Sequence, residues 1–224
     1  MPNHCAELFS NYFPFWNKLT DIQKEKLCNS ITFVKYNKGQ NVHGSSGECT
    51  GVIFLKTGIV RAYLLSEEGK EVTLYRLYTG DVCMLSAACA IQNITFDVFI
   101  DAEEDCEAYI IKSDAFSALM SESLEVENFA LRITTMRFSE VIWAMQQILF
   151  MSFDKRLAVF LIDELAKSDG DTVKMTQEQI AKYVGSAREV VSRMLKYFAF
   201  EGIVEVSRGG VKVIDKKHLK EIAF

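Results

Sequence analysis

Hydrophobic and polar residues repeat with two different periods along the 224 residues of the chain. In residues 4–30 and again in residues 123–151, apolar residues return every three or four positions, which predicts amphipathic helices. Between residues 31 and 113 the pattern changes to seven short runs rich in Val, Ile, Phe, Tyr and Thr, separated by Gly, Asn, Ser or acidic residues. Such runs predict β-strands, and seven of them with regular turns favour a small antiparallel barrel.

The helical segment over residues 123–151 has two apolar rows rather than one. A second row, formed by Phe129, Ile133, Met136 and Trp143, lies beside the main one. Two rows fit a helix held between its own barrel and a partner helix. The alternative is that the whole stripe packs on the chain's own barrel. The residues of the main row, which we call the dimer seam, are Leu131, Thr135, Phe138, Ile142, Met145 and Leu149.

Cap residues predict where other helices begin. Thr20 is a candidate cap near the N-terminus, and Ser113 with Asp114 predicts a short helix ending near Met120. Ser152 and Asp154 predict a break after the long helix and a new helix over residues 155–167. We therefore place the hinge between two domains at residues 151–153.

Near the C-terminus two helix starts occur ten residues apart. Thr176 with Gln179, and Ser186 with Glu189, each have the spacing of a capping box, and Gly185 lies between the helices as a turn residue. After residue 202 the pattern alternates, and an Arg-Gly-Gly turn at 208–210 separates two short strands. This order of elements predicts a winged helix-turn-helix, although the charges on its second helix could also be an ordinary solvated face.

The outer half of the second helix carries Arg188, Glu189, Ser192 and Arg193. Arginine pairs with guanine through two hydrogen bonds, glutamate accepts from the cytosine amino group, and serine bonds a base edge or a phosphate. These side chains therefore predict contacts with double-stranded DNA in the major groove. The other predicted DNA-binding residues are Thr176, Gln177, Ser186, Lys196 and Arg208.

The stretch from 188 to 193 reads Arg-Glu-Val-Val-Ser-Arg. It resembles the recognition helices of the CRP/FNR regulators, which carry R-E-x-x-G-R in the cyclic AMP receptor type and E-x-x-S-R in the FNR type. The resemblance implies an α+β chain with an N-terminal double-stranded β-roll like that of cyclic-nucleotide-binding proteins, a long dimerisation helix and a C-terminal winged helix-turn-helix.

The resemblance also implies domain limits and partners. We expect a β-roll effector domain over residues 1–122, a dimerisation helix over 123–152 and a DNA-binding domain over 153–224. Such a regulator acts as a homodimer on a palindromic operator and meets RNA polymerase there. Whether it activates or represses does not follow from the residues.

Charge and apolar runs are consistent with this division. From Thr172 onward there are ten Lys or Arg against six Asp or Glu, or +4, and the total of −5 therefore leaves −9 for residues 1–171. The basic end is the predicted DNA end. No secretory signal and no apolar run of membrane-spanning length is present, so we expect a cytoplasmic protein that does not contact a membrane.

Six cysteines, at positions 5, 28, 49, 83, 89 and 106, show no C-x-x-C spacing. In a chain without an export signal, reduced thiols are expected rather than disulfides. The clustered cysteines of FNR itself are missing, so we expect no metal site.

The predicted effector pocket departs from that of the cyclic AMP relatives. Those proteins carry a glutamate for the ribose and an arginine for the phosphate, where this chain has Met84 and Phe96, with Asp97 beside it. A carboxylate repels a phosphate, and a thioether does not bind a sugar hydroxyl in its place. Cyclic AMP is therefore disfavoured. The predicted pocket residues are Val82, Cys83, Met84, Leu85, Phe96 and Asp97.

The effector is unknown, and three readings stay open. An uncharged or apolar small molecule fits the roll. Haem is a second reading, because residues 83–89 are similar to the haem-bearing loop of the carbon-monoxide-sensing relative, with Cys83 matched, Leu85 at the histidine position, and His43 or Met84 as a second ligand. A thiol switch among Cys83, Cys89 and Cys106 is the third, although acidic neighbours would raise the pKa of Cys106.

The rival class is a thiol oxidoreductase using Cys83 or Cys89. Paired-cysteine motifs, a Ser/His/Asp arrangement and a phosphate-binding glycine loop are all missing from the sequence, so we expect no enzyme.

Overall fold

The computed structural model describes residues 2–44, 50–85, 98–168 and 170–224, without the side chains of residues 2–4 and 8. The chain forms two compact units. The first contains residues 1–64 and 74–141, and the second contains residues 65–73 and 142–224. Phe96 and Asp97 of the predicted pocket, together with Cys49 and Cys89, lie outside the described residues.

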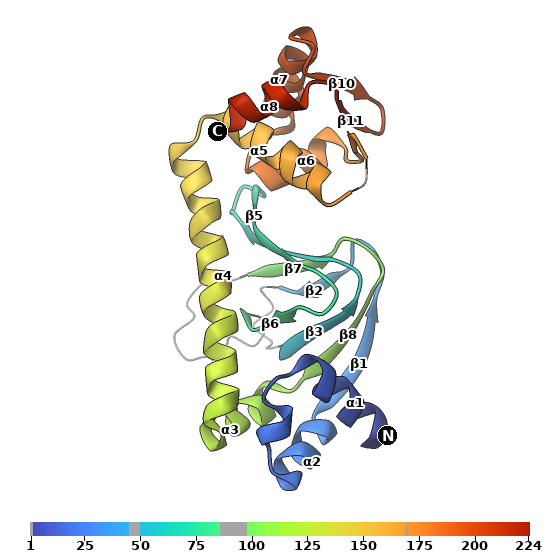
Figure 1. The fold of residues 1–224 in the computed structure, drawn as a ribbon, viewed down its shortest axis with the longest axis vertical. Helices are drawn as coiled ribbons and strands as arrows, with labels where there is room; N and C mark the ends of the chain where they lie inside the picture. Colours follow the sequence, from blue (N-terminus) through green and yellow to red (C-terminus); the bar gives the residue numbers. More distant parts are fainter. Residues whose placement is uncertain (1, 45–49, 86–97, 169) are drawn as a thin grey trace. The chain divides into compact units, whose positions relative to one another are not determined.

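Two four-stranded antiparallel sheets form the β-roll of the first unit (Figure 1). One sheet has the order β1-β8-β3-β6 and the other β2-β7-β4-β5. The register of β1 with β8 runs from Ile31 opposite Ile111 to Tyr36 opposite Cys106. The strands are β1 (Ile31–Tyr36), β2 (Asn41–His43), β3 (Val52–Thr57), β4 (Val60–Leu65), β5 (Glu71–Leu77), β6 (Val82–Cys83), β7 (Phe99–Ala102) and β8 (Cys106–Ile111).

The interior of the roll is apolar, and we call this cluster the roll core. It includes Ile53, Leu55, Ala62, Leu77 and Ile100, which are all almost fully buried. The predicted double-stranded β-roll is confirmed. The short strand β6 is an addition to the seven predicted runs, because two residues are too few to give a periodic signal.

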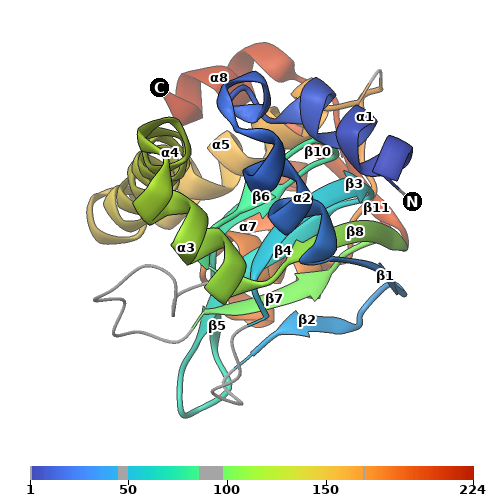
Figure 2. The same cartoon turned by 90° about the horizontal axis from the view of Figure 1, so that it is seen from below.

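Helices α1 (Pro2–Tyr12), α2 (Asp21–Asn29) and α3 (Ser113–Glu122) lie at the same end of the roll (Figure 2). They share a second apolar cluster, which we call the aromatic core, with Phe9, Phe13 and Phe54. A short 3-10 helix, η1 (Trp16–Lys18), joins α1 to α2. The predicted cap Thr20 forms a capping box with Gln23. Helix α3 begins at Ser113 itself, with Lys112 as the N-cap residue.

The prediction that the cysteines are reduced is wrong for one pair. Cys5 of α1 and Cys28 of α2 form a disulfide, with their Cα atoms 5.8 Å apart. The two residues are 23 positions apart in the sequence, a spacing that matches no short motif, and only the packing of α1 on α2 brings them together. Cys83 and Cys106 are free thiols, and both are buried.

Helix α4 (Leu124–Phe150) is one continuous helix of 27 residues (Figure 1). Val126, Ala130 and Arg137 are its buried side chains. Every large apolar residue of the dimer seam is at least 37% exposed, and Phe138 is 63% exposed. The chain's own roll therefore leaves the seam uncovered.

The second unit contains a three-stranded sheet and four helices. The sheet has the order β10-β11-β9, so β9 adds a third strand to the predicted two-stranded wing. Helix α5 begins two residues earlier than expected, and its N-cap Ser152 makes no side-chain cap bond. The elements are α5 (Phe153–Ala166), β9 (Thr172–Val173), α6 (Gln177–Val184), α7 (Arg188–Phe200), β10 (Val204–Ser207), β11 (Gly210–Val213) and α8 (Lys216–Ala223).

One of the two predicted capping boxes in this unit is correct. Thr176 and Gln179 form a capping box at α6. The N-cap of α7 is Ala187 rather than Ser186, and it makes no side-chain cap bond. Gly185 has a φ of +61°, and the Ser186 amide donates to the Ala181 carbonyl at 3.0 Å. Ser186 therefore closes the end of α6, and α7 starts one residue later.

Candidate nucleic-acid interface

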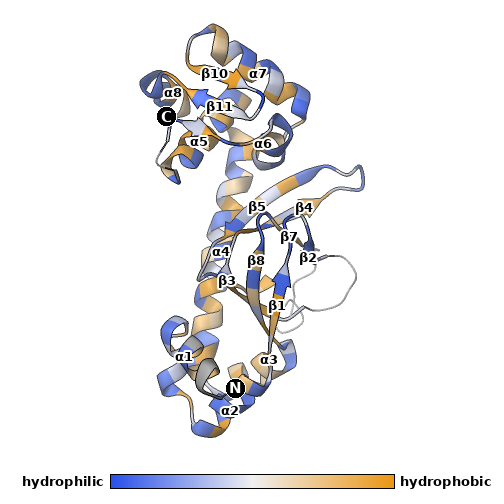
Figure 3. Cartoon of the chain, turned by 90° about the vertical axis from the view of Figure 1, so that its right-hand side faces the viewer, coloured by the Kyte–Doolittle hydropathy of each residue, from blue (hydrophilic) through white to orange (hydrophobic). Residues whose placement is uncertain are grey.

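Helix α7 has one buried face and one exposed face. Val191, Leu195 and Phe198 are fully buried against the rest of the second unit. Arg188, Glu189, Arg193 and Lys196 are exposed, and Ser192 is half-buried. Figure 3 shows hydrophilic and hydrophobic residues alternating along α7. The buried row fixes the helix, so its polar side chains have a defined position at the surface.

A cavity of about 380 Å³ lies between α6, α7 and the wing. It brings together four predicted DNA-binding residues: Thr176, Gln177, Arg188 and Arg208. The others, Ser186, Glu189, Ser192, Arg193 and Lys196, do not line it. The complete lining is Met175, Thr176, Gln177, Glu178, Arg188, Val206, Ser207, Arg208, Gly210 and Val211.

The polar side chains at this cavity comprise two arginines, two hydroxyls, one amide and the carboxylate of Glu178, so hydrogen-bond donors and cations stand beside one anion. Sequence reasoning did not include Ser207, although it directly precedes Arg208 in the wing turn. Gly210 is required here, because a Cβ atom on it would lie 2.6 Å from the Val173 carbonyl oxygen. The wing therefore packs closely on β9.

The described residues of the predicted effector pocket are all buried but do not share one environment. Cys83 and Leu85 belong to the roll core, whereas Val82 and Met84 belong to the aromatic core. Neighbouring residues of an extended segment point to opposite sides. Only Cys83 and Leu85 therefore face the interior of the roll.

Arg137, which sequence reasoning did not select, joins α4 to the roll. It is 5% exposed, and its guanidinium bonds both carboxylate oxygens of Glu140 at 2.9 Å and lies 3.5 Å from Asp81. It also lies over the ring of Tyr75, 5.2 Å from the centroid. The Tyr75 hydroxyl is 3.9 Å from the Cys83 sulfur. In the sequence, the feature that could have indicated this contact is a single arginine between Met136 and Phe138 in an otherwise apolar part of the helix.

The pKa values follow from these contacts. Burial raises the pKa of Tyr75 well above its ordinary value, and Cys83 adds to that shift. Burial would lower the pKa of Arg137, but the hydrogen bond and charge of Glu140 raise it overall. Tyr75 stays neutral and Arg137 stays charged at physiological pH.

Two family descriptions match the chain. Residues 33–123 match the cyclic nucleotide-binding domain, and residues 155–222 match the Crp-like helix-turn-helix domain. The crystal structure of a Crp/Fnr-family protein from Eubacterium rectale is 41% identical and superposes with a TM-score of 0.90, covering 95% of this chain and 99% of that chain. The chain belongs to the CRP/FNR family of transcriptional regulators.

The curated relatives of this CRP/FNR regulator are less similar to it. The fumarate and nitrate reduction regulatory protein of Yersinia pestis is 23% identical, with 98% of this chain and 90% of the relative covered. Electron transport regulator A of Shewanella oneidensis is 25% identical, with 83% and 76% covered. The chain is thus a DNA-binding transcription regulator.

No group of three or more His, Cys, Asp or Glu side chains that could hold a metal occurs in the part of the CRP/FNR chain that the structure describes. The His43 ring nitrogen Nδ1 lies 2.8 Å from the Thr50 hydroxyl. Burial raises the pKa of Cys106 above its ordinary value and outweighs the opposing effect of its hydrogen bonds to the Ile59 and Glu104 backbone. Cys106 is therefore a poor nucleophile. Over ranges 2–44, 50–85, 98–168 and 170–224, no helix is both long and apolar enough to span a bilayer.

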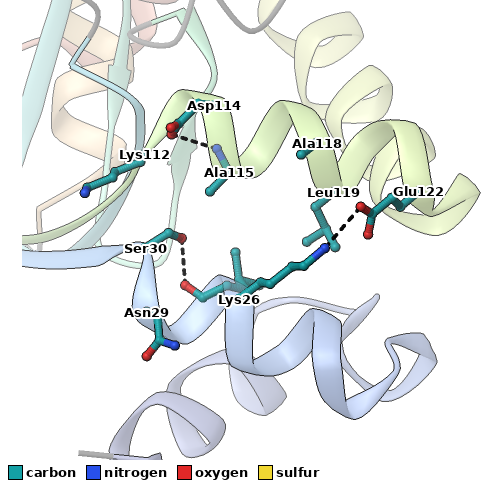
Figure 4. Close-up of a pocket in the computed structure, with 10 residues that line it drawn as sticks. Lys26, Asn29, Ser30, Lys112, Asp114, Ala115, Ala118, Leu119 and Glu122 are labelled. Atoms are coloured by element: carbon teal, nitrogen blue, oxygen red, sulfur yellow. Dashed lines mark hydrogen bonds and ion pairs between the residues drawn. The ribbon is translucent and has the colours of Figure 1, made fainter.

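A groove of about 360 Å³ lies between α2 and α3 of this regulator (Figure 4). Lys26 reaches across it to Glu122, with 3.3 Å between the charged atoms. Its walls include Leu27 and Leu119, and of the predicted effector residues that the structure describes, Val82, Cys83, Met84 and Leu85, none lines it. The groove joins two helices and is separate from the roll core.

Proposed function

We propose that the chain acts as a homodimer on a palindromic operator whose half-sites resemble TTGA. The single observation that carries this proposal is the polar row on α7, with Glu189 and Arg193 exposed and Ser192 half-buried, held by a buried apolar row. Arginine reads guanine and glutamate reads cytosine in the major groove. The operator's two-fold symmetry would match that of the dimer.

The uncovered dimer seam supports the homodimer. Phe138 and Leu149 are 63% and 64% exposed, and Met145 is 49% exposed. An apolar row of this length on one helix is costly in water, and a second copy of the same helix would cover it. In this proposal Arg188 and Arg208 contact backbone phosphates from the cavity beside α6, and the dimer meets RNA polymerase on DNA in the cytoplasm.

The effector in this proposal is an uncharged or apolar small molecule. The side chains around Cys83 and Leu85 are apolar, and the buried Arg137 is already paired with two carboxylates. A phosphate would therefore find no unpaired cation there among the residues that the structure describes. The thiol oxidoreductase alternative is weak, because Cys83 is buried and the pKa of Cys106 is raised.

Selection of binding sites from random double-stranded DNA tests the operator. We expect a palindrome with TTGA-like half-sites and with centres roughly one helical turn apart. The proposal is wrong if the enriched sites lack two-fold symmetry. A duplex with one half-site scrambled is the matched control, and it should bind far more weakly.

A cyclic nucleotide titration tests the effector class. Losing two charge-assisted hydrogen bonds moves a micromolar ligand to about the millimolar range. We expect neither cyclic AMP nor cyclic GMP at about 1 mM to change the thermal midpoint or the operator affinity. Micromolar binding of either nucleotide would contradict the proposed apolar effector.

A further inference from the structure

Helix α1 is attached to the rest of the first unit by apolar contacts and by one covalent bond. Phe9 and Phe13 are each 1% exposed in the aromatic core, and Phe9 stacks on Trp16 with 5.3 Å between ring centroids. Among the α1 side chains that the structure describes, Ser10 donates a hydrogen bond to the Glu7 carbonyl within the same helix, so this bond does not attach α1 to its neighbours. The Cys5–Cys28 disulfide is therefore the specific link between α1 and α2.

Helix α2, by contrast, is fixed independently of this bond. The Lys112 amide donates to the Ser30 carbonyl at 3.1 Å, directly after α2. Lys26 forms its ion pair with Glu122 across the groove in Figure 4. Breaking the disulfide would therefore leave α1 held by its apolar contacts alone, whereas α2 would keep its hydrogen bond and ion pair.

The aromatic side chains that directly follow α1 reach α4, the expected dimerisation helix. The Phe13 ring lies 5.6 Å from the Phe129 ring of α4, and the Phe15 ring lies 5.1 Å from it. Phe129 precedes the first residue of the dimer seam by two positions. A change in how α1 packs is thus a change in what α4 packs against.

A cytoplasmic location, which rests on the proposed function, would expose the Cys5–Cys28 disulfide to reduction. A regulator that binds DNA in the cytoplasm meets a reducing thiol pool, where structural disulfides are rare and those that form are usually transient or redox-sensing. Cys5 and Cys28 are both half-buried, so each residue is partly exposed to solvent. The buried Cys83 and Cys106 lack that exposure.

We propose that Cys5 and Cys28 form a reversible thiol-disulfide switch that controls the packing of α1 and, through the residues that follow it, the contacts of Phe13 and Phe15 with Phe129 of α4. On oxidation by a glutathione disulfide, one protein thiolate displaces one glutathione and forms a mixed disulfide. The second protein thiolate then displaces the other glutathione. Two protein thiols become one disulfide, and their two protons end on the two glutathione thiols. Reduction is the reverse reaction.

Hydrogen exchange of the full-length protein, equilibrated with either reduced glutathione or glutathione disulfide, tests the switch. We expect amides of α1 after Cys5 to exchange at least tenfold faster in the reduced protein. Amides of α2 should change little. In a Trp143→Phe background the only remaining tryptophan is Trp16, because the chain has two. Its fluorescence should report the same change.

The Cys5→Ser and Cys28→Ser variants should show the fast exchange in both redox states, and Cys83→Ser should behave like the wild type. The switch is overturned if α1 exchanges equally in the two states, or if glutathione disulfide does not form the Cys5–Cys28 bond. Operator binding separates the two proposals. If hydrogen exchange of α1 depends on the redox state but the protein does not bind a palindrome, the proposed function alone is wrong. If the protein binds a palindrome but exchange is the same in both redox states, the switch alone is wrong.

Discussion

Helix α7 and the segment around strand β6 each carry residues predicted to act, but they present them in opposite ways. In α7 the selected side chains are exposed except for the half-buried Ser192, whereas residues 82–85 are all buried and divided between two cores. A recognition helix needs only its own period to sort its two faces. The environment of β6 depends on strands and helices from distant parts of the chain. Side-chain changes should therefore affect DNA binding alone in α7 and folding in the roll.

The dimer seam should give the largest effect, because it is exposed like α7 and is expected to pack against a second copy of α4. Ile142→Asp would bury a charge at the interface of each protomer, so we expect a monomer with operator affinity reduced at least about 100-fold, or about 2.7 kcal/mol. Light scattering and a gel shift measure the two outcomes. Ser139→Asp, an exposed neighbour on the same helix, is the control and should remain dimeric. A dimeric Ile142→Asp variant would refute the seam.

Arg137→Met tests the buried side of the comparison. The change leaves Glu140 and Asp81 without their shared cation, and both partners keep some solvent, so the free energy of unfolding should fall by about 2 to 3 kcal/mol. Chemical denaturation measures this, with the exposed Arg132→Met as the matched control. Unchanged stability would mean that Arg137 contributes little to the attachment of α4 to the roll.

Arg193→Ala, unlike Arg137→Met, should reduce the affinity for DNA and leave the free energy of unfolding nearly unchanged. We expect a cost of about 1 to 3 kcal/mol and a relaxed preference at the guanine. Lys196→Ala is the control and should weaken all sequences similarly, with a smaller salt dependence. Equal weakening of all sequences by Arg193→Ala would assign Arg193 to a phosphate instead.

A pH titration gives the smallest effect and concerns the surface of the roll. Hydrogen bonds from Lys35 and Lys56 lower the pKa of Glu107 to about 2. Because the folded pKa is below the ordinary value of 4.5, the stabilisation is present above that value and is lost as the pH falls toward 2. The stability difference between wild type and Glu107→Gln should therefore be larger at pH 7 than at pH 3, measured by urea denaturation. A difference independent of pH would contradict it.

The sequence predicts elements with a local signal and misses those that depend on tertiary contacts. The helix-turn-helix order and the Thr20 and Thr176 caps follow from neighbouring residues, and all are confirmed. The Cys5–Cys28 pair, the third wing strand and the Arg137 contacts each join segments that no short motif connects. The Ser186 cap fails because the αL residue Gly185 commits the next amide to the end of α6. The predicted DNA contacts and the dimer seam stay predictions.

Strand β9 also has a consequence for how the chain folds as it leaves the ribosome. It precedes α6, yet it pairs with β11 through Val173 and Val211. The segment between the two paired strands therefore contains both α6 and α7. Helices form from near neighbours, whereas a pairing that spans a long loop must wait for the later strand to be synthesised. We therefore expect nascent chains to form α6 and α7 before the wing is anchored. A chain whose synthesis stops before residue 210 would therefore contain α7 but lack β11, the strand that joins the wing to β9.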